Sequence, residues 1–155
     1  MLHIAVAINS LALIAEIILY GAKLDIRDVN DNTPLHYAAS LGQLELCSFL
    51  IEKGCSSDLK NKKRMEPLHA SILSNDFEVL DFFIENRNPQ KDRHAAKALL
   101  EAPVSRGYTC AHLAIENNSV DIFHHLIKYE VDLNLQDASK KTPLHLAIEL
   151  GKKMN

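Results

Sequence analysis

The stretch Thr33-Pro34-Leu35-His36-Tyr37-Ala38 decides the fold of this chain, because closely similar stretches recur along the sequence. The recurrences are Leu2-His3-Ile4-Ala5, Pro67-Leu68-His69-Ala70, Thr109-Cys110-Ala111-His112-Leu113-Ala114 and Thr142-Pro143-Leu144-His145-Leu146-Ala147. Their five histidines lie 33, 33, 43 and 33 residues apart. A period of about 33 residues indicates a chain built from stacked repeats.

The second repeat shows how each unit is expected to fold. Residues 28–32 are rich in Asp and Asn and predict a turn. Thr33 suits a helix N-cap and Pro34 suits the first helical position. A first helix is therefore expected to run to about Leu41, and a second helix to end at Gly54.

The period and the T-P-L-H-x-A signature resemble those of the ankyrin-repeat family. The resemblance covers essentially the whole chain and implies an all-α fold, a solenoid of stacked helix-turn-helix units with β-turn fingers. We predict one domain over residues 1–155, with three full repeats and partial first and last repeats. The expected units are 1–27 (partial), 28–60, 61–103, 104–136 and 137–155 (partial). Because the outer units are incomplete, the chain is interpreted as a segment of a longer protein.

Two features depart from the regular repeat. Residues other than glycine stand where the family ends its helices with glycine, and they predict looser turns. These residues are Asn75, Arg87, Asn118 and Glu130.

The second departure is an insertion near 88–102, which accounts for the 43-residue interval. Asn88 and Pro89 predict the start of an extra helix, and Pro103 predicts its end. Its apolar face would contain Ala95, Ala98, Leu99 and Ala102. The insertion is either a tolerated surface feature or a small helix that recognises a partner or shapes a groove.

Composition restricts the class of protein. The formal net charge of −3, with 6% aromatic residues and no Trp, favours neither nucleic acid nor an anionic membrane as a partner. Three cysteines without C-x-x-C spacing indicate neither a disulfide framework nor a zinc site. They suit a reducing compartment, so we expect a cytoplasmic or nuclear location.

Residues 2–22 are strongly apolar, but they do not predict a membrane span or a signal peptide. Asn9 and Glu16 interrupt the apolar run, and no basic segment precedes it. His3 lies in register with the other repeats, so this segment is interpreted as the first repeat. Direct membrane insertion is not expected.

The histidines do not predict a metal site. Stacked repeats lie roughly 10 Å apart, whereas a zinc–nitrogen bond is about 2 Å. The family resemblance implies instead that these imidazoles join neighbouring loops by hydrogen bonds. Of the adjacent His124 and His125, one is expected to face the stack and the other solvent. We predict no metal and no cofactor.

The sequence also predicts no catalytic site. It lacks the G-x-x-x-x-G-K-[ST], G-x-G-x-x-G, H-E-x-x-H and G-x-S-x-G patterns. A nucleophilic pair of Cys110 and His112 is conceivable, but both residues belong to the helix-starting signature. The chain is therefore predicted not to be an enzyme.

The resemblance implies a non-catalytic module that binds another protein through its concave face and finger tips. Carried over by position, the candidate partner-binding residues are Asn30, Asn32, Leu41, Lys60, Lys62, Lys63, Met65, Leu73, Arg106, Tyr108, Glu116 and Lys141.

A cluster of four cations, Lys60, Lys62, Lys63 and Arg64, lies within one predicted finger. Together with Met65 and Tyr108, which we expect to be exposed contact residues, it favours an acidic or phosphorylated partner segment. The alternative is a solvated loop whose charge only improves solubility.

Three alternative functions stay open. The stretch from Gly107 to Ala114, after an insertion between central repeats, resembles inhibitor-of-NF-kappa-B proteins, which mask a Rel-type transcription factor; the extra residues that such proteins would have in the first interval are missing. The second alternative is a substrate-recruiting array within a larger enzyme, effector or membrane protein. The third is a structural spacer. Self-association through the incomplete end repeats is also expected to be possible.

Overall fold

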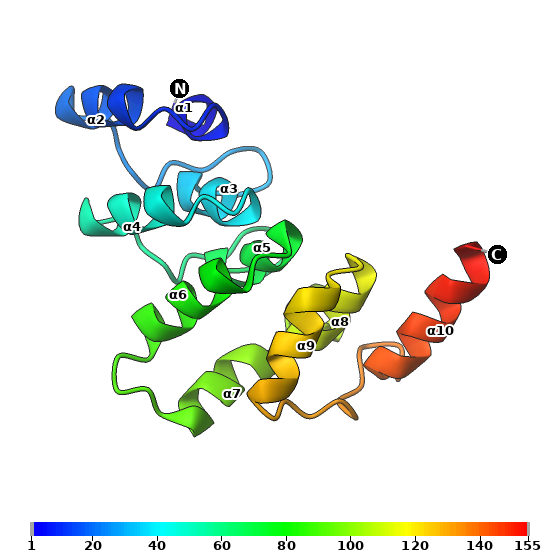
Figure 1. The fold of residues 1–155 in the computed structure, drawn as a ribbon. Coiled ribbons are helices and arrows are strands. Elements are labelled where there is room, and N and C mark those ends of the chain that lie inside the picture. The colour runs from blue at the N-terminus through cyan, green and yellow to red at the C-terminus, as the bar shows by residue number, and fades with distance from the viewer. Residues whose placement is uncertain (1, 155) are drawn as a thin grey trace.

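The computed structural model describes residues 2–154, and the side chains of residues 2–151. Its helices pair and stack into a curved array, with the two ends of the chain far apart (Figure 1). No strand occurs among the described residues. The predicted all-α solenoid is confirmed.

The helices follow the predicted order of paired units. They are α1 (Leu2–Ala7), α2 (Leu11–Leu19), α3 (Pro34–Ser40), α4 (Leu44–Glu52), α5 (Pro67–Ser71), η1 (Ile72–Ser74), α6 (Phe77–Arg87), α7 (Arg93–Glu101), η2 (Ser105–Gly107), α8 (Cys110–Glu116), α9 (Val120–Lys128) and α10 (Pro143–Met154). Four fingers precede α3, α5, α8 and α10, and we name them by their repeats. They are the second finger (28–32), the third (61–65), the fourth (104–108) and the fifth (137–141).

Four of the five signature histidines, those of α3, α5, α8 and α10, cap the helix in which they lie. In α3, His36 Nδ1 accepts a hydrogen bond from the backbone N–H of Thr33 at 3.1 Å, and Pro34 occupies the first turn. The same bond recurs at the starts of α5, α8 and α10. The predicted helix start at Thr33 is therefore confirmed, and the capping bond explains why the histidine recurs at the third helical position.

The other ring nitrogen joins neighbouring repeats. Because Nδ1 accepts, Nε2 carries the proton and donates it to a carbonyl of the next finger. These bonds link His3 to Asn32 at 3.0 Å, His36 to Met65 at 2.9 Å and His112 to Lys141 at 3.1 Å. The hydrogen-bonding role implied by the family resemblance is confirmed at these three junctions.

His69, before the insertion, departs from this ladder. Its ring is 4% exposed, and its Nε2 has no hydrogen-bond partner among residues 2–154. The corresponding carbonyl, that of Tyr108, accepts the bond from Val104 N within its own finger, as the matching carbonyls of the other fingers do, but it accepts none from His69. The junction between the third and fourth repeats therefore lacks the bond that closes the others.

Acid is expected to destabilise the protein partly through His69. Burial, followed by the positive charges of Lys60 and Arg87, lowers the pKa of His69 from 6.5 to about 4. The unfolded chain therefore binds a proton in this window that the folded chain does not. The free energy of unfolding should fall by up to roughly 3 kcal/mol as the pH drops from about 6.5 to about 4. Urea unfolding across this range should show a flatter dependence in His69→Asn; an unchanged slope would contradict the assignment.

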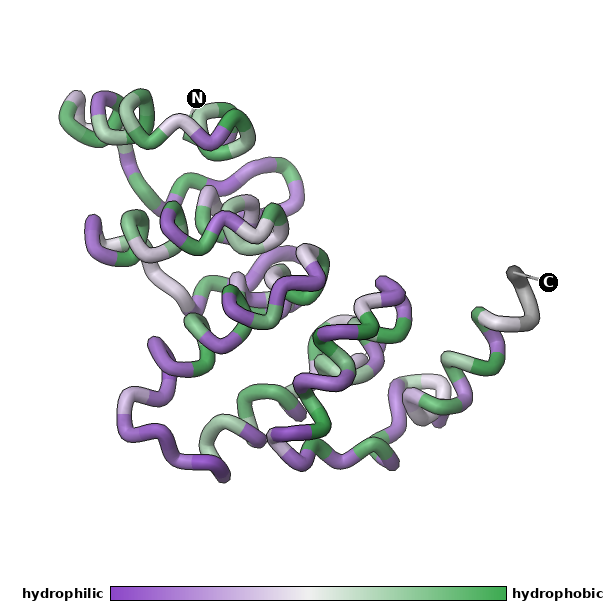
Figure 2. Tube along the Cα trace, in the orientation of Figure 1, coloured by the Kyte–Doolittle hydropathy of each residue, from purple (hydrophilic) through white to green (hydrophobic). Residues whose placement is uncertain are grey.

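The insertion forms an extra helix, but not where Asn88 and Pro89 predict it. Asn88 instead ends α6, and its Nδ2 donates to the Asp92 carbonyl at 2.6 Å. Asp92 is the true N-cap, because its carboxylate accepts from His94 N at 3.0 Å. The predicted start was therefore wrong, because this turn separates α6 from α7. The connection is largely hydrophilic (Figure 2).

The buried face of α7 also differs from the predicted one. Ala96 and Leu100 are 3% and 1% exposed and belong to the core. Ala95 and Leu99 are only half-buried, and Ala98 and Ala102 are exposed. The shift follows from packing, since α7 lies against α8 and its Ala96 and Leu100 are buried in the core.

The residues that stand in place of the family's glycines adopt the left-handed backbone conformation at three of the four positions. Asn75, Asn118 and Glu130 have φ of 55° each, in the left-handed region. Arg87 does not, because it stays within α6 and its Nη1 donates to Glu66 Oε2 at 2.6 Å. The expectation of a loosened turn at Arg87 was wrong.

Adjacent fingers are joined by one backbone bond each. Lys62 N donates to Asn30 O at 3.0 Å, Ser105 N to Lys63 O at 2.9 Å and Ala138 N to Arg106 O at 2.9 Å. The fingers thus form a continuous ridge along one side of the stack.

Gly107→Ala is expected to destabilise this ridge by about 2 kcal/mol. Gly107 has φ of +71°, and an added Cβ would lie 2.8 Å from the backbone nitrogen of Ala138 in the fifth finger. Gly54→Ala is the matched control, because its φ is also positive but its Cβ would meet no atom within 4 Å. Chemical denaturation should show the larger loss for Gly107→Ala; equal losses would contradict the close approach.

The outer repeats expose large apolar side chains. Leu19 and Tyr20 at one end are 82% and 87% exposed, and Leu144 and Ile148 at the other are 67% and 50% exposed. Self-association through these faces stays a prediction. None of the described helices has the length and apolar character that crossing a bilayer requires.

Candidate functional site

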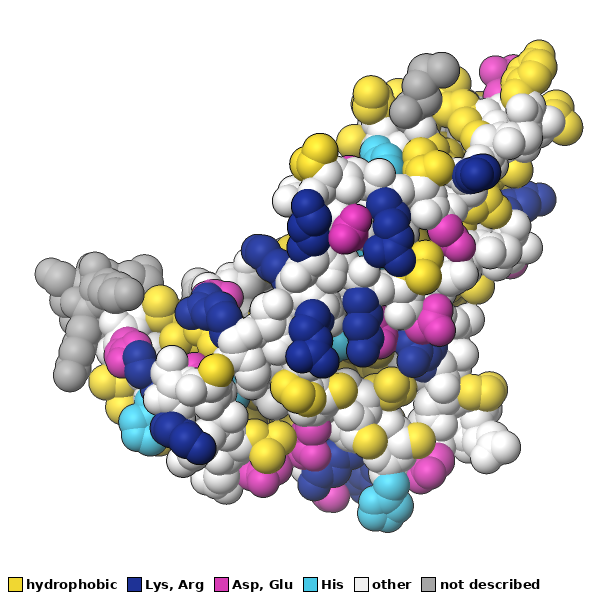
Figure 3. All heavy atoms as spheres, turned by 180° about the vertical axis from the view of Figure 1, so that it is seen from behind, with side chains coloured by type: hydrophobic (Ala, Val, Ile, Leu, Met, Phe, Trp, Pro, Cys, Tyr) yellow, Lys and Arg dark blue, Asp and Glu magenta, His cyan; other side chains and the backbone are white. Residues whose placement is uncertain are grey.

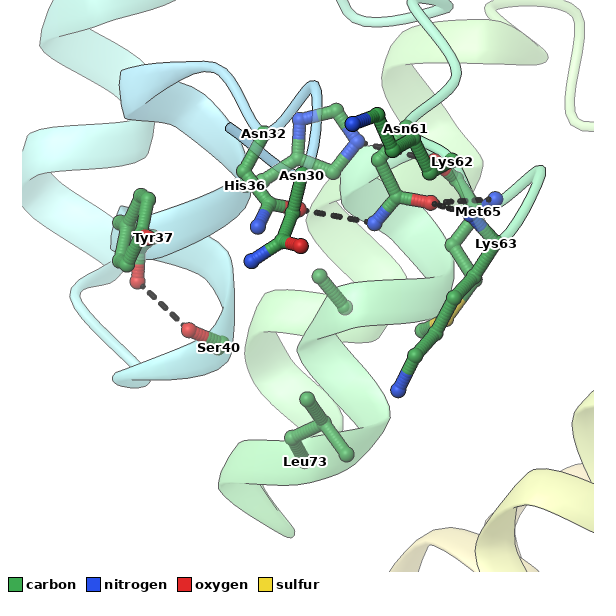
Figure 4. Close-up of a pocket in the computed structure, with 11 residues that line it drawn as sticks. Asn30, Asn32, His36, Tyr37, Ser40, Asn61, Lys62, Lys63, Met65 and Leu73 are labelled. Carbon is green, nitrogen blue, oxygen red and sulfur yellow. Dashed lines mark hydrogen bonds between the residues drawn. The ribbon is translucent and has the colours of Figure 1, made fainter. Parts of the chain in front are cut away.

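The second and third fingers and the helices α3 and α5 enclose a groove of about 470 Å³ (Figure 4). Its lining combines polar finger residues with apolar helix residues. It consists of Asn30, Asn32, His36, Tyr37, Ser40, Asn61, Lys62, Lys63, Met65, Ala70 and Leu73. Six of the twelve predicted contact residues therefore meet in one place, namely Asn30, Asn32, Lys62, Lys63, Met65 and Leu73.

Asp28 holds the second finger in shape. Its Oδ1 accepts from the backbone N–H groups of Asn30 and Asn32 at 2.8 Å each, and its Oδ2 accepts from Tyr37 OH at 2.5 Å. The Tyr37 bond, followed by the backbone bonds, lowers the pKa of Asp28 to about 2 against the opposing effect of burial. The carboxylate therefore stays charged, and one wall of the groove is preformed.

Asn61 has the same role in the third finger and joins it to the second. Its Oδ1 accepts from Lys63 N and Met65 N at 2.9 and 3.0 Å. Its Nδ2 donates to Asn32 Oδ1 at 2.8 Å (Figure 4). Asn61 thus fixes the spacing of the two fingers across the groove.

The third finger carries cations without carboxylate partners. Lys63 and Arg64 are exposed and form no ion pair with a described residue. Lys62 Nζ donates to the carbonyl of Val29 at 2.5 Å, and Lys60 Nζ lies 4.0 Å from Glu66 Oε1. Lys and Arg side chains gather over the middle of the face opposite to that of Figure 1 (Figure 3). We call these four residues, Lys62, Lys63 and Arg64 of the third finger together with Lys60 directly before it, the basic finger.

The predicted contacts of the fourth and fifth fingers are already paired. Arg106 Nη1 lies 2.9 Å from Glu116 Oε1, and Lys141 Nζ lies 2.7 Å from Glu149 Oε1. These four residues lie outside the groove, as does Leu41, which is 52% exposed. The structure therefore does not unite all twelve predicted residues into one surface.

Two predicted contact residues are buried rather than exposed. Tyr108 is 2% exposed, because the Arg106 guanidinium lies 4.4 Å from its ring centre and donates to its hydroxyl at 2.6 Å. Met65 is 7% exposed and reaches the groove only from beneath. The expectation that both are adaptable surface contacts was wrong, since each packs under its own finger.

Sequence reasoning missed Tyr37 and Asn61. Asn61 occupies the position in the third finger that Asp28 occupies in the second, 33 residues earlier, so the repeat register contained the signal for it. Tyr37 lies four residues before the predicted contact residue Leu41, but only the folded chain shows its bond to Asp28.

The buried thiol and the paired histidines do not form a second site. Burial raises the pKa of the Cys110 thiol to about 12, so it is protonated at neutral pH. His124 is exposed, whereas His125 Nε2 lies 2.7 Å from Asp81 Oδ1 on α6. One histidine thus faces the stack and the other solvent, as predicted.

Comparison with known proteins agrees with this geometry. A family model described as ankyrin repeats (three copies) matches residues 2–95 and 87–154. The chain belongs to the ankyrin-repeat family. This ankyrin-repeat chain is 36% identical to mouse Rabankyrin-5 and 34% identical to human Rabankyrin-5, over 70 residues in each case. Either alignment covers 39% of the chain and only 6% of the relative's length.

Proposed function

We propose that this chain binds an acidic or phosphorylated segment of another protein in the groove between its second and third fingers. The observation that supports the proposal is the contrast between the fingers. In the fourth and fifth fingers Arg106 and Lys141 have carboxylate partners, and Lys140 alone forms no ion pair with a described residue. The basic finger contains three cations without such an ion pair, namely Lys62, Lys63 and Arg64.

The groove offers both charge and apolar contact. A carboxylate or phosphate group at the rim would accept charge-assisted hydrogen bonds from Lys62 and Lys63. Leu73, which is 48% exposed, provides an apolar contact farther along α5 and η1 (Figure 4). The chain is thus a non-catalytic interaction module that recognises an extended acidic segment with an apolar side chain beside its charges.

Preorganisation supports the same function. Asp28 and Asn61 fix the two finger backbones before any partner arrives. A preformed groove loses little conformational entropy on binding, so a few contacts can give measurable affinity.

Backbone NMR with a synthetic acidic peptide containing one leucine tests the location. We expect shift changes at 30–32, 61–65 and Leu73, and weaker binding at higher salt. Changes confined to the fourth and fifth fingers, or none with peptide in excess, would contradict the proposal. A phosphoserine version distinguishes a simple charge preference from phosphate recognition.

A further inference from the structure

The second helices of the first three repeats form a separate groove. α2, α4 and α6 lie in one column of the stack, beside the column of α1, α3 and α5 (Figure 1). Between them lies a groove of about 500 Å³. It is lined by Leu11, Leu44, Glu45, Ser48, Phe49, Glu52 and Phe82 and shares no residue with the groove of the basic finger.

The floor of this outer groove is apolar and incompletely covered. Leu11, Leu44, Phe49 and Phe82 pack against the core, yet each stays partly exposed. They come from three different helices, so the apolar surface crosses two repeat junctions. Partial exposure of two aromatic rings and two leucines leaves area that a partner side chain would remove from water.

The charges on the outer groove are acidic and regularly spaced. Glu45 and Glu52 are both exposed, and neither forms an ion pair with a described residue. They lie seven positions apart on α4, so they share one helix face at a separation of about 10 Å. Among the described residues, Glu52 accepts one side-chain hydrogen bond, from Ser48 Oγ at 3.3 Å. The nearest cation along α4 is Lys53, whose Nζ lies 5.2 Å from the ring centre of Phe49.

We propose that the outer groove binds a basic amphipathic helix of a partner protein. A helix lying along α4 presents cations seven positions apart at the same spacing as Glu45 and Glu52. Apolar side chains between these cations then contact Phe49 and Phe82. The charge of this partner is opposite to that of the segment proposed for the basic finger, so the two sites select different segments and neither proposal depends on the other.

Fluorescence anisotropy with a synthetic helical peptide tests the outer groove. The peptide carries two lysines at the spacing of Glu45 and Glu52, with leucines between them on the same face. Glu45→Gln/Glu52→Gln should weaken its binding at least tenfold. Glu16→Gln/Asp132→Asn, which changes the net charge equally at exposed positions outside the groove, should leave binding within twofold. Circular dichroism first establishes that both variants fold.

Backbone NMR of the unmodified chain provides a second measurement that requires no variant. The basic peptide should shift resonances of residues 44–52 and of Phe82. Separately, in the anisotropy assay, Lys62→Glu/Lys63→Glu should bind the basic peptide as well as the unmodified chain. Absence of binding, equal weakening in both charge variants, or shifts confined to the fingers would overturn the proposal. Sedimentation equilibrium tests whether a second copy of the chain occupies the groove instead. A dimer that Glu45→Gln/Glu52→Gln abolishes would assign the groove to self-association and overturn the proposal of a partner helix.

Discussion

Lys62→Glu/Lys63→Glu is expected to weaken binding of the acidic peptide by about 30-fold, a loss of about 2 kcal/mol. Both lysines lie at the rim of the groove between the second and third fingers. The substitution removes two attractive charges and places two carboxylates against an acidic ligand. Isothermal titration calorimetry at two salt concentrations measures the loss, and the variant should also show a weaker dependence of affinity on salt.

The matched control is Lys23→Glu/Lys128→Glu. It changes the net charge by the same amount at two exposed lysines that do not line this groove. Its affinity should stay within about threefold of the unmodified chain, since charges beyond a Debye length of about 10 Å are largely screened. Equal losses of affinity in both variants would show that binding depends only on net charge, and would contradict a site on the basic finger. Lys62 also donates a hydrogen bond to Val29 O, and the double substitution removes that bond. Lys63→Glu alone keeps the bond, and it should still weaken binding of the acidic peptide several-fold.

Phe83→Ala is expected to lower the free energy of unfolding by about 3–5 kcal/mol. Phe83 in α6 is fully buried and is among the largest side chains of the core, so its removal leaves a cavity in the third repeat. In a solenoid each repeat is stabilised by its neighbours. We therefore also expect the repeats on either side to unfold less cooperatively, with a broader or two-step urea transition.

Phe82→Ala is the natural comparison, because the same side chain is removed one position along the same helix. Phe82 is only partly buried, and its ring lies 5.4 Å from that of Phe83 in an edge-on arrangement. Its loss should cost less than half as much, since less apolar area and no enclosed cavity are involved. Similar costs for the two substitutions would contradict the assigned burial. Circular dichroism during urea titration measures both variants.

The regular parts of the fold follow from local sequence. Thr33, Pro34 and His36 make the helix start through contacts within four residues, so the signature predicts it wherever it recurs. The left-handed turns at Asn75 and Asn118 follow from the repeat register for the same reason. The insertion helix was predicted to exist, but its start and buried face were not. They depend on the Asn88–Asp92 turn and on packing against α8.

Only part of the candidate site could be predicted from the sequence. Repeat register places Lys62 and Lys63 on a finger, and the structure brings them to one groove with Asn30, Asn32 and Leu73. Register does not distinguish a cation that points to solvent from one that is paired, so Arg106 was grouped with the lysines. Its partner Glu116 lies ten residues later in the sequence, and only the folded chain brings the two side chains together.

The sequence by itself therefore determined the repeat, its helix starts and the existence of an insertion, because each depends on interactions within one unit of about 33 residues. Tertiary structure alone decided which cations stay unpaired, that Met65 and Tyr108 are buried, and that the His69 ring lacks the inter-repeat bond. It also decided that α2, α4 and α6 share an acidic, apolar groove. These properties arise where neighbouring repeats meet, and contact between repeats depends on packing that a period in the sequence does not specify.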